Sequence, residues 1–120
     1  VNEFSLTITR KNGDVHVQAV DVIGKFIADH CLKGAISTEV GPHVHNYHLQ
    51  GVIRVRWPKA KKDCTELQKI LKKLLPERGN GYRIVAKPLG TNQTFVAMLG
   101  YVTKDSGKYL FFCLFCPKTF

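Results

Sequence analysis

Three residues carry side chains that could bind a divalent metal ion: Glu39, His48 and Gln50. They offer one carboxylate, one imidazole and one amide oxygen. This mixed, rather hard set suits Mg²⁺ or Mn²⁺ better than Zn²⁺, which prefers more nitrogen and sulfur ligands. Such a site binds its metal weakly and leaves positions for water and a phosphate oxygen. The alternative is a solvated polar strand face, because an isolated His-x-Gln pattern arises often by chance.

A rival set of ligands lies just before this motif. His43 and His45 precede His48, so three histidines fall within six residues and could form a zinc or nickel site. The Gly-Pro loop that carries the first two imposes no fixed geometry on them. Their simpler role would be to flank a bound ligand.

Tyr101 and Lys104 could supply a nucleophile and a cation. They fall in a predicted helix whose apolar stripe consists of Phe95, Met98, Leu99 and Val102. At ~100° per residue, Tyr101 lies more than a quarter turn from the centre of that stripe, and Lys104 follows on the same outer side. A protonated phenol is a weak nucleophile, so attack on a phosphodiester would need a nearby metal or cation. The commoner fate of such a tyrosine is to cover the helix edge, partly exposed.

A strand over residues 47–57 would position the histidine and the glutamine. Apolar and polar residues alternate along it, as in a half-buried antiparallel strand. The inward set is Tyr47, Leu49, Gly51, Ile53, Val55 and Trp57, and the outward set is His48, Gln50, Val52, Arg54 and Arg56. A preceding strand over residues 35–40 would bring Glu39 onto the same outward face.

The other elements complete an α+β fold: a central antiparallel five-stranded sheet with helices mainly on one face. Further strands are expected over residues 4–10, 82–87 and 109–115. We expect a first helix over residues 17–32 that ends at Gly34, and a second, with Leu67 and Leu71 in its apolar stripe, that begins with a Thr65–Gln68 capping box. Thr91 or Asn92 would cap the third helix. On the uncovered face the alternation collects Ser5, Thr7, Glu39, His48, Gln50, Arg54, Arg56, Arg83 and Lys87.

The composition indicates a polyanionic partner. The chain has 120 residues, predicted as a single domain over 1–120, and its 18 Lys and Arg against 9 Asp and Glu give a net charge of +9. Nucleic acid is the first candidate and an anionic membrane surface the second, although no apolar run approaches the ~20 residues of a membrane span. The four cysteines are interpreted as mostly buried thiols of a reducing compartment, so we expect an intracellular protein.

These motifs resemble the HUH replication-initiator endonucleases, and most of all the Rep proteins of circovirus-type single-stranded DNA viruses and their relatives. The resemblance rests on Phe4-Ser5-Leu6-Thr7, on Glu39 followed by His48-Leu49-Gln50-Gly51, and on Tyr101-Val102-Thr103-Lys104. The three motifs occur in the family's order and span nearly the whole chain. Gln50 stands where the name-giving pattern has its second histidine, a change that circovirus-type members share.

The resemblance implies a ferredoxin-like or RRM-like sheet and an enzyme that nicks and joins single-stranded DNA at a stem-loop origin of rolling-circle replication. Tyr101 would form a 5′-phosphotyrosine link, Lys104 would assist it, and Glu39, His48 and Gln50 would bind Mg²⁺ or Mn²⁺. The outward residues Ser5, Thr7, Arg54, Arg56, Arg83 and Lys87 would contact DNA. A helicase domain would lie in a missing part of the chain, and a viral protein of this kind would act in the host nucleus.

Three alternatives remain open from the sequence. The domain could bind single-stranded RNA or DNA without catalysis, although the outward face carries few aromatic residues on which bases could stack. Cys113-x-x-Cys116 could be a redox or zinc half-site, but core packing is the simpler interpretation. A set of lysines could either contact DNA flanks or keep a helix soluble: Lys59, Lys61, Lys62, Lys69, Lys72 and Lys73.

Overall fold

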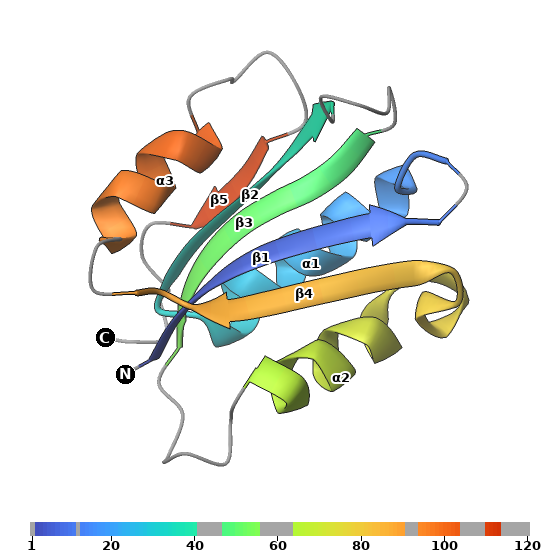
Figure 1. The fold of residues 1–120 in the computed structure, drawn as a ribbon, viewed down its shortest axis with the longest axis horizontal. Helices are drawn as coiled ribbons and strands as arrows, with labels where there is room; N and C mark the ends of the chain where they lie inside the picture. The colour runs from blue at the N-terminus through green and yellow to red at the C-terminus, as the bar shows by residue number, and fades with distance from the viewer. Residues whose placement is uncertain are drawn as a thin grey trace.

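The elements follow the predicted alternation of strands and helices. The computed structural model describes residues 2–11, 13–40, 47–55, 64–90, 94–103 and 110–113. Its elements are β1 (Asn2–Arg10), α1 (Val17–His30), β2 (Lys33–Val40), β3 (Tyr47–Val55), α2 (Cys64–Leu74), the 3-10 helix η1 (Pro76–Gly79), β4 (Tyr82–Pro88), α3 (Phe95–Thr103) and β5 (Leu110–Cys113), as labelled in Figure 1.

All five strands join one antiparallel sheet in the order β4-β1-β3-β2-β5. Strand β3 lies between β1 and β2 and is antiparallel to both, so β1 and β2 run in the same direction with α1 as their crossover. Strands β4 and β5 form the two edges. The predicted class, an α+β fold with a central antiparallel five-stranded sheet, is confirmed.

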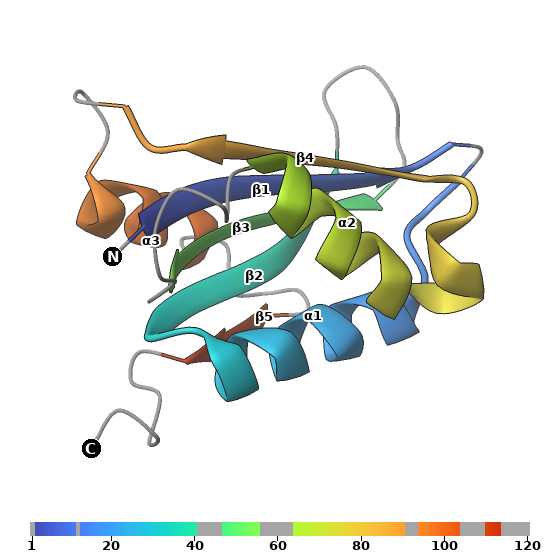
Figure 2. The same ribbon diagram turned by 90° about the horizontal axis from the view of Figure 1, so that it is seen from below.

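One face of the sheet packs against α1 and α2 (Figure 2). The inward residues Phe4, Leu6 and Ile8 of β1, Ile36 of β2, and Leu49, Ile53 and Val55 of β3 all belong to this buried layer. The largest fully buried side chains of this layer include Leu6, Ile8, Ile23, Ile27, Ile36, Leu49, Ile53, Leu67 and Leu71. Burying each such side chain contributes roughly 1.5–3 kcal/mol, so this layer accounts for most of the hydrophobic stabilisation.

Gly34 has a different role from the one expected. It lies in β2 and does not end α1, which already ends at His30. A Cβ at Gly34 would lie 2.8 Å from Cγ2 of Ile27 and 3.1 Å from the carbonyl oxygen of Val52. The glycine therefore lets α1 approach the sheet closely.

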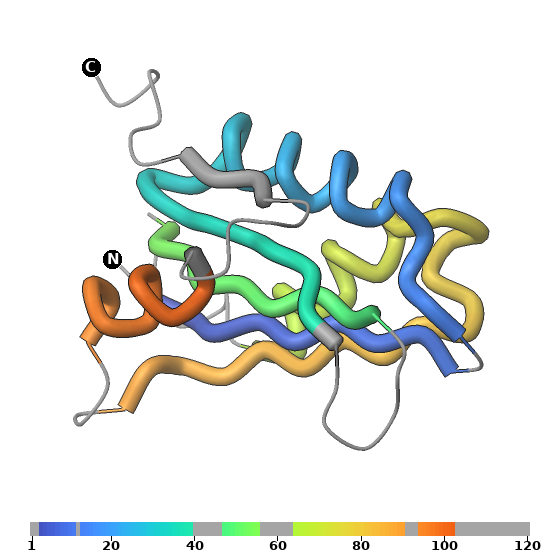
Figure 3. The backbone as a smooth tube through the Cα atoms, turned by 90° about the horizontal axis from the view of Figure 1, so that it is seen from above, coloured from blue at the N-terminus to red at the C-terminus, as the bar shows by residue number. Residues whose placement is uncertain are grey.

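Helix α3 covers part of the face that the sequence suggested was open. The backbone of α3 runs beside β2 and β3, as the tube in Figure 3 shows. Its side chains Phe95 and Val102 are buried against Ala35 and Val52 of those two strands. The prediction that Val52 belongs to an uncovered polar face was therefore wrong. The helices still lie mainly on one face, with α1 and α2 opposite α3.

The ends of two helices differ from the prediction. Helix α2 begins at Cys64, so Thr65 lies inside it, and Oε1 of Gln68 instead accepts a hydrogen bond of 2.8 Å from the backbone N–H of Ala86. This bond occupies a backbone donor on β4, an edge strand of the described sheet. At α3 the cap is Thr94, whose Oγ1 accepts from the N–H of Ala97 at 3.1 Å. Thr91 and Asn92 lie outside the described residues.

Two features near the ends of strands also bear on the predictions. Tyr47, expected in the core, begins β3 and is 40% exposed. Its predicted core partner Trp57 lies outside the described residues. The last strand, predicted over 109–115, is described over Leu110–Cys113 and pairs with β2 as an edge, while residues 109, 114 and 115 lie outside the described residues. No helix in the described part of the chain has the length and apolar character of a membrane span.

Candidate active site

Glu39 and His48 meet across β2 and β3. The antiparallel register places the two residues directly opposite each other. Nε2 of His48 lies 3.0 Å from Oε1 of Glu39, and both side chains remain partly exposed on the α3 side of the sheet. A carboxylate and an imidazole are thus within one hydrogen bond of each other and partly exposed, close enough for both to bind one metal ion.

Gln50 lies two residues along β3 on the same face, roughly 6.6 Å from His48 at strand spacing. It pairs in register with Ser37 of β2 and with Thr7 of β1. Oγ1 of Thr7 donates a long hydrogen bond of 3.4 Å to Oε1 of Gln50. The amide oxygen is therefore held toward β1 by a weak hydrogen bond, which it could exchange for a bond to a metal ion.

These three donors fit a hard divalent cation. No cluster of three or more His, Cys, Asp or Glu side chains suited to a metal occurs among the described residues. Within the part of the chain that the structure describes, an amide or hydroxyl oxygen is therefore the available kind of third ligand beside Glu39 and His48, and Gln50 provides one. Few protein ligands with open positions are typical of Mg²⁺ and Mn²⁺ sites that also bind phosphate.

The end of α3 is fixed beside these ligands. The backbone carbonyl oxygen of Val102 accepts a buried hydrogen bond of 2.8 Å from Oγ of Ser37, the residue that pairs with Gln50. Tyr101 immediately precedes Val102 and is 43% exposed, so its ring is not part of the core beneath the helix. The predicted partner Lys104 lies outside the described residues.

A groove of about 570 Å³ runs across β4, β1 and β3 on the same face of the sheet. It is lined by Ser5, Thr7, Thr9, Gln50, Arg83, Val85, Lys87 and Met98. Four of the six residues predicted to contact DNA are therefore brought together, with one candidate metal ligand among them. Met98 contributes from α3, and Tyr101 follows it by about 60° around the same helix. Met98 is thus the α3 residue that lines the groove, and the tyrosine lies one turn beyond it toward the C-terminal end of the helix.

Arg54 has partners of its own outside this groove. Its Nε donates to Oε2 of Glu3 at 2.7 Å, and its guanidinium carbon lies 4.6 Å from the centroid of the Phe95 ring. These contacts connect the first residue of α3 to β3 and β1. A DNA contact by Arg54 remains a prediction, and Arg56 lies outside the described residues.

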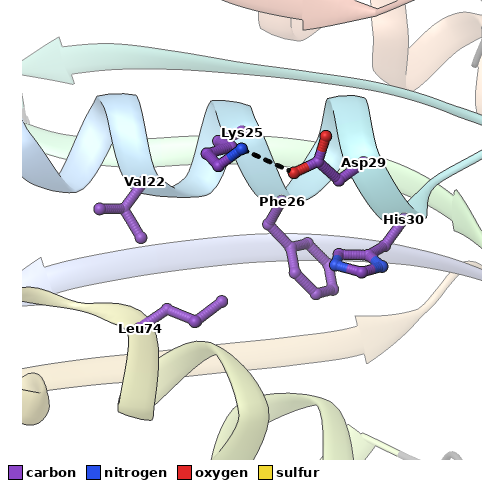
Figure 4. Close-up of a pocket in the computed structure, with 6 residues that line it drawn as sticks. All are labelled: Val22, Lys25, Phe26, Asp29, His30 and Leu74. Atoms are coloured by element: carbon purple, nitrogen blue, oxygen red, sulfur yellow. Dashed lines mark ion pairs between the residues drawn. The ribbon is translucent and has the colours of Figure 1, made fainter.

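A second cavity, of about 290 Å³, lies between α1 and α2 and does not include any candidate site residue. Figure 4 shows its lining residues Val22, Lys25, Phe26, Asp29, His30 and Leu74, with Lys25 and Asp29 paired at 3.0 Å. Both helices cover the face of the sheet opposite the groove. This cavity is thus separate from the candidate active site.

The remaining expectations fall partly beyond the described residues. His43, His45, Cys116 and Lys59, Lys61 and Lys62 lie outside them, as does the side chain of Cys113. Lys69, Lys72 and Lys73 are on α2, on the far side of the sheet from the groove.

Sequence reasoning assigned no role to Ser37, Thr9 or Glu3. Alternation along the predicted strands places Thr9 and Ser37 on the outward face, which is the one signal available for them, whereas Glu3 precedes the predicted first strand. Ser37 contacts Val102 and Glu3 contacts Arg54, while Thr9 lines the groove. All three thus meet residues from segments distant in sequence, and the fold of the sheet brings them together.

The family model described as the Replitron, HUH endonuclease domain, matches residues 5–113. The matched region begins in β1 and ends in β5, so it includes the three candidate ligands, the groove and Tyr101. Neither the curated proteins nor the solved structures contain a significant match to the chain.

Proposed function

The chain belongs to the Replitron HUH endonuclease domain family, and from this membership we propose that it nicks and rejoins single-stranded DNA by covalent catalysis through Tyr101. The family assignment makes the domain an endonuclease of DNA replication. The proposal adds the nucleophile, the metal ligands and the DNA-binding surface.

Glu39, His48 and Gln50 would hold the divalent metal, Mg²⁺ or Mn²⁺. When bound, such a metal withdraws charge from the non-bridging oxygens of the scissile phosphate and so lowers the barrier to attack. The observation that carries this assignment is the 3.0 Å contact between His48 and Glu39, with Gln50 next on the same face.

Tyr101 would attack the phosphorus. Its phenol oxygen forms a new P–O bond while the bond from phosphorus to the 3′ oxygen breaks. The phenol loses one proton and the leaving 3′ oxygen gains one, so the step is balanced and leaves a 5′-phosphotyrosine and a free 3′-OH. The reverse reaction, with a 3′-OH as nucleophile, joins the ends. The exposure of Tyr101, 43% at the end of α3, supports this role because a substrate can reach part of the side chain from solvent.

The groove would hold the single strand. Arg83 and Lys87 are exposed on β4 four residues apart, roughly 13 Å at strand spacing, and could each contact a phosphate. Ser5 and Thr7 line the groove floor with hydroxyls that can bond to phosphates or bases. The strand would then run from β4 toward the ligands on β3.

Peptide mapping after incubation with DNA tests the proposal. The protein is mixed with a randomised pool of single-stranded oligonucleotides and Mn²⁺, digested with a protease and with nuclease, and analysed by mass spectrometry. We expect a nucleotide adduct on the peptide that contains Tyr101. Absence of any adduct, with the pool bound, would favour a non-catalytic single-strand-binding module.

A further inference from the structure

We infer that Ser37 is a positioning residue for the nicking reaction: its hydroxyl fixes the C-terminal end of α3, and with it Tyr101, at a set distance from the metal ligands. This inference depends on the function proposed above. It concerns a side chain that belongs neither to the ligand set nor to the groove lining.

The hydrogen bond of Ser37 falls where a helix needs a partner. Val102 is the penultimate residue of α3. The last four carbonyl groups of an α-helix have no N–H donor within the helix, so they need a partner from elsewhere. Oγ of Ser37 donates to the carbonyl oxygen of Val102 at 2.8 Å, in a site where Ser37 is only 4% exposed. Because the bond is buried, losing the hydroxyl would leave this carbonyl without the donor that the described residues supply to it.

Ser37 is also a neighbour of two candidate metal ligands, Glu39 and Gln50. It shares a face of β2 with Glu39, two residues further on, and it is directly opposite Gln50 on β3. One hydroxyl thus connects the strand positions of two candidate ligands to the residue next to Tyr101. A shift of the helix end by even ~1 Å relative to these ligands would cost rate, because covalent catalysis depends steeply on the placement of the nucleophile.

Much of the described packing under α3 is apolar: Phe95 and Val102 are buried with Ala35 and Val52, and Met98 and Leu99 pack beside them. Apolar burial of this kind is non-directional, whereas a hydrogen bond has a preferred distance and angle. At the other end of α3, Arg54 contacts Phe95 about one and a half to two turns away. The described contacts of α3 with the sheet thus include a directional one at each end, and the one at Ser37 is adjacent to the nucleophile.

A matched pair of variants tests the inference. Ser37→Thr keeps the hydroxyl and adds one methyl group. Valine has nearly the same shape as threonine but lacks the hydroxyl, so any steric effect of the larger side chain is common to both variants. The measurement is the single-turnover rate of adduct formation with the randomised oligonucleotide pool and Mn²⁺, together with the affinity for the pool without metal. We expect Ser37→Val to react about 10- to 100-fold more slowly than Ser37→Thr, with affinities within about twofold.

Ser37→Ala supplies a second test that adds no volume. We expect the same loss of rate, measured at a temperature well below the unfolding midpoint of the variant, so that a change in stability alone would not produce it. Equal rates for Ser37→Thr and Ser37→Val, or a rate for Ser37→Ala equal to that of the unsubstituted protein, would overturn the inference.

The two proposals fail differently. If the unsubstituted protein forms its adduct on Tyr101 and the Ser37 variants react normally, only the positioning role is refuted. If no adduct forms on Tyr101 in the unsubstituted protein, the proposed function itself is refuted, and the role of Ser37 with it.

Discussion

Nε2 of His48 and Oε1 of Glu39 are 3.0 Å apart across the antiparallel pair formed by β2 and β3. This contact between residues nine positions apart in the chain arises from the register, which sets the two side chains opposite each other. It gives the candidate metal centre a carboxylate and an imidazole in direct contact, and it makes the role of the carboxylate open to test.

Replacing Glu39 by Gln removes the negative charge while keeping the shape. We expect the apparent affinity for Mn²⁺ to fall by about 10- to 100-fold, whether the carboxylate binds the metal or orients His48. The free Mn²⁺ signal in electron paramagnetic resonance measures this without reference to activity. Asp21→Asn, an exposed acid on α1 away from the site, is the control and should leave the affinity unchanged. Unaltered Mn²⁺ binding by Glu39→Gln would remove Glu39 from the site.

Neutralising the groove cations should weaken DNA binding in a salt-dependent way. For the double variant Arg83→Gln and Lys87→Gln we expect the slope of log affinity against log salt to decrease by about 1.4, since each phosphate contact to a single strand contributes roughly 0.7. Fluorescence anisotropy with the oligonucleotide pool at several salt concentrations measures the slope.

The matched control for that experiment is Lys69→Gln and Lys72→Gln on α2. It removes the same charge from the opposite side of the sheet, and we expect no change in slope. A larger effect from the α2 pair than from the groove pair would mean that the single strand binds over α2.

Arg54 should matter for stability more than for DNA affinity. Arg54→Gln loses the contact with the Phe95 ring and the charge pair with Glu3, and we expect the free energy of unfolding to decrease by about 1 kcal/mol. Urea denaturation measures this, with Lys25→Gln, whose side chain is 78% exposed, as the control. A decrease in the DNA salt slope with no change in stability would instead support a phosphate contact.

Gly34→Ala should destabilise the fold. The new Cβ would meet Cγ2 of Ile27 at 2.8 Å and the backbone oxygen of Val52 at 3.1 Å, and relieving such contacts costs typically ~1–3 kcal/mol. Gly100→Ala is the contrasting change, because nothing lies within 4 Å of its added Cβ. Since Gly100 is inside α3, this substitution should stabilise by up to ~1 kcal/mol. Denaturation of both variants checks the sign of each effect.

Much of the architecture follows from the local pattern of the sequence. Period-two alternation correctly assigned the faces of β1, β3 and β4, because each strand has one buried face and a slip by one residue would expose its apolar set. The same pattern placed Glu39 beside His48, since both lie on the outward face of strands joined by a short connection.

The remaining features depend on contacts between distant segments. Val52 has the outward parity of a polar face, yet it is buried because α3 returns over β3. Arg54 was predicted to contact DNA from its charge and face alone, whereas its partners Glu3 and Phe95 come from β1 and α3. Gln68 matched a capping pattern, but the edge of β4 offered its side chain a backbone donor. Patterns within a single segment of the sequence cannot predict these contacts, because each contact joins two distant segments.

The most direct test of the account compares two tyrosines of similar exposure, Tyr101 at 43% and Tyr47 at 40%. Tyr101→Phe and Tyr47→Phe each remove one hydroxyl, and each variant is incubated with the oligonucleotide pool and Mn²⁺ before the mass of the intact protein is measured. We predict that Tyr47→Phe gains the mass of a covalently attached oligonucleotide, as the unsubstituted protein does, while Tyr101→Phe binds the pool without any gain in mass. A covalent adduct on Tyr101→Phe would contradict the account.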